Sequence, residues 1–150
     1  MAYWIIVERY ENWLIDKAEG FVRFGIPETK LKLAAFIVPG DKLITYVSSG
    51  ISKFSDIRVV LDPPFTKMKF GGNYDTSYAS AISTRKLVIL PEESWVPVQE
   101  LKGIIKILGT GDSRQIFRTS LKRLDNDDGL VIEGVMMQRN SPQAPCTSSI

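Results

Sequence analysis

The chain has 150 residues, of which 44% are hydrophobic and 24% charged, and its formal net charge is +2. These values are typical of one globular domain with its own core, and so mild a charge permits nucleic-acid binding without arguing for it. Histidine is absent and Cys146 is the only cysteine, which excludes Ser-His-Asp and Cys-His nucleophiles, internal disulfides and the common histidine-containing zinc sites. No apolar run reaches the roughly 20 residues of a membrane span, and no basic leader precedes Tyr3, so we expect a cytoplasmic protein without membrane contact, metal or other cofactor.

The first third of the chain mixes extended and helical patterns. Tyr3–Val7 is a run of aromatic and β-branched residues, which predicts a buried strand. Residues 10–20 place apolar side chains at helical spacing and end in glycine, a common helix stop. We expect 21–24 to be short and extended, and the sequence Gly25-Ile26-Pro27 to break it. Residues 28–36 carry apolar side chains among lysines and fit either a helical turn or a covering loop.

Three longer strands are predicted next. The turn Pro39-Gly40-Asp41 precedes a strand over 41–48 whose two faces both carry apolar residues, as in a strand covered on both sides or in a barrel wall. Ser49-Gly50 has the composition of a hairpin turn, and the strand over 51–61 that follows it ends before two prolines, which cannot donate to a sheet ladder. A loop rich in aromatic residues then leads to a fourth strand over 79–90.

Helical spacing dominates the last third. Residues 101–108 predict an amphipathic helix, 112–124 a second helix capped by its first aspartate or serine, and 125–137 a last one. Strands followed by helices indicate an α+β domain, here one domain over 1–137 with a small, strongly curved sheet or barrel and helices at its ends. Residues 138–150 are rich in serine, proline and glutamine, and we expect them to be disordered.

Four segments, in their order and spacing, resemble the EVE domain, a PUA-like β-barrel related to the YTH and ASCH domains. They are Tyr3-Trp4-Ile5-Ile6-Val7, Glu11-Asn12-Trp13, Gly25-Ile26-Pro27 and the stretch from Pro39 to Val47. The segment 117–124, with Asp127-Asp128 after it, is similar to the closing part of small archaeal standalone EVE proteins. The resemblance covers about residues 3–137 and implies a pseudo-β-barrel of five or six strands with flanking helices. It also implies a reader of modified nucleobases in DNA or RNA.

The chain departs from that family in two places. The third strand of the family often has a small residue at its centre, whereas this chain reads Ile57-Arg58-Val59-Val60-Leu61 without a glycine. A later tryptophan of the YTH aromatic cage has no clear match either, and Phe70 or Tyr74 is our substitute candidate.

A reader of a flipped base needs aromatic rings that restore stacking and polar groups that meet the base edge. We assign this pocket to Glu8, Asn12, Trp13, Phe24, Tyr46, Ser48 and Phe54. Phosphate contacts are assigned to Lys30, Lys53, Lys67, Lys69, Arg118 and Lys122. Each assignment has a plainer structural alternative: core packing for the aromatic residues, capping or ion pairing for the polar ones, and solvation for the cations.

We therefore expect a non-enzymatic nucleic-acid-binding module, with DNA or RNA as the partner and the oligomeric state open. The first alternative is a small amidohydrolase of the ASCH type acting on modified nucleosides, with a Lys/Thr/Glu arrangement for which Lys42, Thr45 and Glu8 supply the residue types. The second is a protein-interaction domain that uses the loop over 70–78.

Overall fold

The computed structural model describes residues 1–62, 65–66, 78–109 and 116–140. Its elements are strands and helices, with four strands in succession in the middle of the chain. In chain order they are β1 (Tyr3–Glu8), α1 (Tyr10–Ala18), β2 (Arg23–Pro27), the 3₁₀ helix η1 (Glu28–Lys30), α2 (Leu31–Ala34), β3 (Lys42–Val47), β4 (Lys53–Val60), β5 (Phe65–Thr66), β6 (Tyr78–Ile89), η2 (Glu92–Ser94), β7 (Val96–Pro97), η3 (Val98–Leu101), β8 (Leu121–Leu124) and α4 (Asn126–Asn140).

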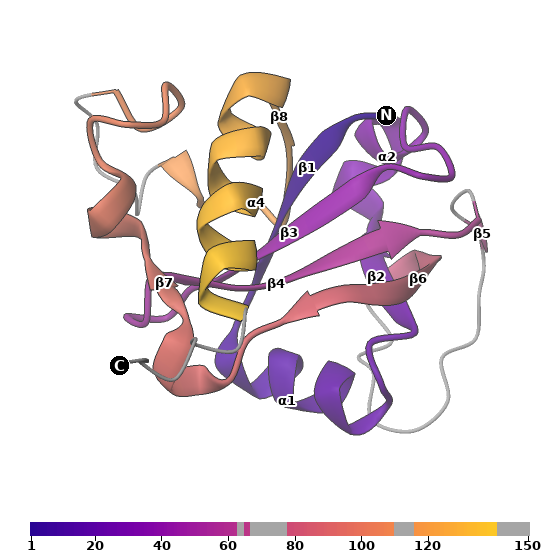
Figure 1. Ribbon diagram of the computed structural model, residues 1–150. Coiled ribbons are helices and arrows are strands. Elements are labelled where there is room, and N and C mark those ends of the chain that lie inside the picture. Colours follow the sequence, from indigo (N-terminus) through magenta and orange to yellow (C-terminus); the bar gives the residue numbers. More distant parts are fainter. Residues whose placement is uncertain (63–64, 67–77, 110–115, 141–150) are drawn as a thin grey trace, which may run out of the picture.

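The strands form one mixed, curved sheet in the order β2-β6-β4-β3-β1-β8, with β5 beside β6 and β7 beside β4. β1 and β3 run parallel, with Tyr3 opposite Lys42, and the other described pairs are antiparallel. In Figure 1, α4 crosses in front of the sheet and α1 lies below it. This arrangement confirms the predicted α+β pseudo-barrel.

Two hydrophobic cores lie on opposite faces of the sheet, because successive strand residues point to opposite sides. Tyr3 and Ile5 of β1 belong to the larger core, which α1 and α4 help to close. Trp4 and Ile6 belong to the second core, which α2 covers. The sheet is therefore covered on both faces, as the apolar pattern over 41–48 predicts.

The turn before β3 ties the start of the chain to the sheet. Asp41 is buried, and its carboxylate accepts hydrogen bonds from Ala2 N (2.9 Å), Trp4 Nε1 (3.0 Å) and Val38 N (3.1 Å). The Asp41 side chain thus satisfies donors that the turn and the first strand would otherwise bury unpaired.

Three segments differ from the sequence-based expectation. The sequence Gly25-Ile26-Pro27 continues β2 rather than breaking it, because a register shift at Pro27 accommodates the missing donor. Residues 102–108, after the end of η3 at Leu101, form turns instead of an α-helix, since Gly103 has a φ of +84°, which no right-handed helix contains. Leu121–Leu124 is a strand rather than helix, because pairing with the edge of β1 outweighs its helical spacing.

The last helix is longer than predicted. α4 ends at Asn140, three residues beyond 137, so 138–140 are helical rather than disordered. The backbone of Gly129, in the first half of α4, packs directly against the ring of Tyr3, and a β-carbon at this position would overlap that ring. The rest of the predicted tail lies outside the described residues.

Candidate ligand pocket

The carboxyl ends of β1 and β3 meet at a cavity of about 370 Å³. These two strands are parallel, so Val7 and Tyr46 lie side by side there, and the β3–β4 turn and the segment before β8 complete the wall. The cavity is lined by Val7, Tyr46, Ser48, Ser49, Gly50, Ser52, Phe117 and Arg118. None of these side chains is acidic, and the exposed Arg118 makes the opening positive.

Tyr46 contributes an aromatic wall and a polar group that has no partner. Its ring centre is 4.5 Å from that of Phe117 and 5.5 Å from that of Phe54. Its hydroxyl is enclosed, and within the described residues it makes no hydrogen bond. A buried hydroxyl without a partner costs roughly 1–3 kcal/mol, and native proteins rarely leave one so.

The β3–β4 turn at the cavity opening has strained backbone φ angles. Ser49 and Ser52 have φ values of 62° and 56°, and with Phe21 they are the non-glycine residues of positive φ within the described ranges. Such conformations cost about 1–3 kcal/mol and gather at functional sites. Ser48 anchors the turn, because its N–H donates to the carbonyl oxygen of Glu8 at 2.8 Å and its Oγ donates to the same oxygen at 3.2 Å.

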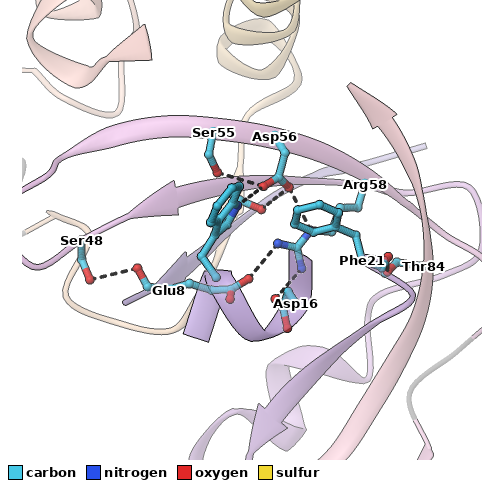
Figure 2. Close-up of polar contacts among 10 residues, drawn as sticks. Glu8, Asp16, Phe21, Ser48, Ser55, Asp56, Arg58 and Thr84 are labelled. Atoms are coloured by element: carbon cyan, nitrogen blue, oxygen red, sulfur yellow. Dashed lines mark hydrogen bonds and ion pairs between the residues drawn. The ribbon is translucent and has the colours of Figure 1, made fainter. Parts of the chain in front are cut away.

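A buried ionic cluster lies behind this turn, between α1 and the sheet (Figure 2). The fully buried Arg58 donates from Nη2 to Glu8 Oε1 (3.0 Å), from Nη1 to Asp16 Oδ2 (2.9 Å) and from Nε to Asp56 Oδ1 (2.9 Å). Its guanidinium lies 4.9 Å from the ring centre of Phe21. Asp56 also accepts hydrogen bonds from Thr45 Oγ1, Ser55 Oγ and Trp13 Nε1.

The cluster holds three carboxyl groups against one guanidinium, so its charges do not balance. Burial, together with the nearby charges of Asp16 and Asp56, raises the pKa of Glu8 well above its usual value despite the opposing effect of Arg58. Burial alone would lower the pKa of Arg58, but the charges of Asp56, Glu8 and Asp16 outweigh it and raise that pKa. The cluster therefore binds a proton at Glu8 more readily than an exposed glutamate does.

The structure brings only part of the predicted pocket together. Tyr46 and Ser48 line the cavity, and Phe54 packs buried beside Tyr46. Glu8 takes part in the Arg58 cluster with its side chain, and Trp13 does so with its ring nitrogen.

The remaining predicted pocket residues lie elsewhere. Trp13 also borders a separate cavity of about 430 Å³ with Lys17 and Glu92. Phe24 belongs to the core on the other face of the sheet, and Asn12 is half-buried on α1. These positions do not converge with Tyr46 on one cavity.

The predicted phosphate ligands are scattered. Arg118 lines the cavity, whereas Lys30 lies on η1, Lys53 begins β4 and Lys122 lies on β8 beside a third cavity. The other candidates, including both substitute aromatics, lie outside the described residues; they are Lys67, Lys69, Phe70 and Tyr74.

Phe117 is part of the cavity wall and Arg58 of the ionic cluster, and neither was among the site residues predicted from the sequence. Phe117 has the spacing of a helix core residue, and its place beside Tyr46 follows only from the pairing of β8 with β1. Arg58 stands among the apolar residues Ile57, Val59 and Val60 of β4, which is itself a sign that buried carboxylates accompany it.

Lys42, Thr45 and Glu8, the three residues of the amidohydrolase alternative, each form hydrogen bonds with a different residue. Lys42 Nζ donates to Glu133 Oε1 at 2.8 Å on the α4 face of the sheet. Thr45 donates to Asp56, and Glu8 accepts from Arg58. Within the described ranges no three or more His, Cys, Asp or Glu side chains are arranged so that they could hold a metal ion, and no described helix is long and apolar enough to cross a membrane.

Comparison with known proteins adds evidence at the level of the fold. No family model matches the sequence, and no curated protein matches it at a significant level. A structural-genomics protein from Agrobacterium tumefaciens is similar in structure with a TM-score of 0.66 and 15% identity, over 99% of this chain and 100% of that one. A hypothetical protein from Leishmania major gives a TM-score of 0.66 and 12% identity, over 94% and 98% of the two chains. The YTH domain-containing protein mmi1, solved in a complex with RNA, gives 0.66 and 12%, over 90% and 80%. This chain therefore has a fold that YTH domains share.

Proposed function

We propose that this protein is a non-enzymatic nucleic-acid-binding module that takes a nucleobase, carrying a modification, into the cavity between the ends of β1 and β3. The observation that carries the proposal is the cavity itself, whose wall brings two aromatic residues, Tyr46 and Phe117, next to the exposed Arg118.

The shape and charge of the cavity suit such a ligand. The rings of Tyr46 and Phe117 form an aromatic wall, and base–aromatic stacking contributes roughly 1–3 kcal/mol per base. That gain offsets the few kcal/mol needed to unstack a base from its neighbours. Arg118 at the opening is placed to meet a phosphate, and no carboxylate of the lining repels one.

Two further observations support the proposal. The fold is shared with a YTH domain that was solved in a complex with RNA. The order of the sequence motifs also resembles the EVE domain, whose members read modified bases. The proposed site differs from the sequence-based expectation, because the ring beside Tyr46 belongs to Phe117, whereas Trp13 and Phe24 lie elsewhere.

The test is a binding titration of the full chain at fixed low salt with short DNA and RNA oligonucleotides. The probes carry 5-methylcytosine, 5-hydroxymethylcytosine, N6-methyladenine or no modification. We expect at least tenfold preference for one modified base, about 1.4 kcal/mol. Phe117→Leu, which removes one ring of the aromatic wall, should reduce that preference several-fold, whereas Phe24→Leu, in the core on the other face of the sheet, should not. Equal, strongly salt-dependent binding of all probes would contradict the proposal, since it would reveal only a basic surface.

A further inference from the structure

The helix α4, which crosses in front of the sheet in Figure 1, is apolar on its outer side as well as on its buried side. Leu130 is 60% and Met137 is 42% exposed, and the helical period places both across the helix from the buried Ile132. From position 129 to position 137 the one polar residue is Glu133, whose carboxylate is engaged in an ion pair. A helix that is apolar all round is normally covered all round, so the outer side of α4 has the character of a contact surface.

A glycine lies at the centre of this outer side. Gly134 lies about one turn from both Leu130 and Met137, and no described atom is within 4 Å of the place that its β-carbon would occupy. The Tyr3 ring explains Gly129, the other glycine of α4, but no described part of the chain explains Gly134. Glycine weakens a helix interior more than any residue except proline, and it allows another backbone to approach closely.

We infer that α4 docks antiparallel against α4 of a second copy of this chain, with the two helices crossing at Gly134, and that the chain thereby forms a two-fold symmetric dimer. A two-fold interface uses the same patch on both copies. This patch is self-complementary, because the glycine leaves room at the crossing and the large side chains one turn away on either side fill the space beside it. No residue of α4 lines the described cavity between β1 and β3, so the dimer is independent of the proposed function.

The charges at the two ends of α4 favour a second copy in this orientation. Asp127 and Arg139 lie seven and five residues from Gly134, which corresponds to about 10.5 and 7.5 Å along the helix axis. In an antiparallel pair that crosses at Gly134, Asp127 of one copy therefore lies within about 3 Å of Arg139 of the other, measured along the axis. Both residues already form exposed ion pairs within the chain, with Lys106 and Glu100, so acids and cations alternate across the interface. A parallel pair would instead bring the two acidic first turns together and align the helix dipoles.

The experiment measures the mass of the full chain by sedimentation equilibrium, without nucleic acid, at chain concentrations from about 1 to about 300 μM. A contact confined to one helix of about 22 Å is small, so we expect the mass of a dimer at the highest concentration and of a monomer at the lowest. Leu130→Asp buries a charge in the interface and should raise the dissociation constant at least about tenfold. The matched control Phe36→Asp places the same charge at a 74% exposed position next to α2 and should change the constant less than about threefold.

Gly134→Ala separates this inference from a general loss of structure. The new methyl group should favour the helix of the monomer, yet it should hold the two backbones apart and raise the dissociation constant at least about tenfold. Asp127→Arg and Arg139→Asp should each weaken the dimer, and the double variant should restore it to within about threefold of the unaltered chain. A double variant no better than the single ones would overturn the antiparallel arrangement.

Two other results would overturn the inference as a whole. The first is a chain that stays monomeric at every concentration, which would leave the outer side of α4 to a different protein. The second is a dimer that Leu130→Asp and Gly134→Ala leave unchanged, which would place the interface elsewhere. Neither result bears on the nucleic-acid titration, so the proposed function and this inference fail or stand separately.

Discussion

Removal of the Arg58 guanidinium tests whether Arg58 neutralises the buried carboxylates around it. In the variant Arg58→Met the side chain keeps much of its apolar volume, but Glu8, Asp16 and Asp56 lose the cation that contacts all three. Asp56 retains hydrogen bonds from three neutral donors, namely Thr45, Ser55 and Trp13. Glu8, whose pKa burial already raises, can then take up a proton more readily, because Arg58 is the group that opposes that rise.

Removal of one partner of a buried ion pair leaves an uncompensated charge in the interior and costs roughly 3–5 kcal/mol. Proton uptake by Glu8 relieves more of this cost at pH 5 than at pH 7, because the loss of Arg58 raises the pKa of Glu8 further. Arg58→Met should therefore lose about 4 kcal/mol of the free energy of unfolding at pH 7 and clearly less at pH 5.

The assay is urea denaturation followed by tryptophan fluorescence at both pH values, because Trp13 donates directly to Asp56 and reports on this region. The control is Arg85→Met, which removes the same charge from an exposed position on β6 and should change stability by less than about 0.5 kcal/mol. A loss below about 1 kcal/mol at pH 7, or an equal loss at both pH values, would refute the assignment of Arg58 as the neutralising group of a water-excluded cluster.

Three further predictions follow from individual side chains. The pKa of Glu8 is raised in the folded protein, so protonated Glu8 contributes fully to the free energy of unfolding below the unfolded-state pKa of 4.5. This contribution is lost as the pH rises through the folded-state pKa. Glu8→Gln should therefore flatten the decline of stability in denaturation curves measured from pH 4 to 9. Gly129→Ala should cost roughly 1–3 kcal/mol, because the new methyl overlaps the Tyr3 ring, whereas Gly134→Ala, with nothing within 4 Å, should gain up to about 1 kcal/mol; equal thermal shifts would contradict this. Tyr46→Phe without ligand should leave the free energy of unfolding unchanged or raise it by about 1 kcal/mol, and a loss above 2 kcal/mol would mean that the hydroxyl has a structural partner.

Strand patterns in the sequence predicted most of the sheet. The strand over 41–48 has apolar residues on both faces, and β3 is covered on both sides in the structure. The run Tyr3–Val7 and the helix over 10–20 correspond to β1 and α1 within a few residues. These elements could be predicted because their own residues have the periodicity that their burial requires.

The failures fall where local periodicity and tertiary pairing disagree. Leu121 and Leu124 are buried at a three-residue spacing that fits a helix, yet they lie on β8, with the side chains between them more exposed. Residues 101–108 have the spacing of an amphipathic helix, and Gly103 diverts the backbone. In both places a neighbouring element, or one backbone angle, decides the structure.

The candidate site divides in the same way. The sequence by itself determined that the protein has an α+β pseudo-barrel, lacks histidine chemistry and has aromatic and polar residues at its strand ends. Only the tertiary structure decided that Tyr46 and Ser48 share a cavity with Phe117 and Arg118. The two pairs of residues lie about 70 positions apart along the chain. They meet because β3 pairs in parallel with β1, and β1 pairs antiparallel with β8. Composition and periodicity report on a residue's own segment, whereas a pocket depends on the partners that long-range pairing brings to it.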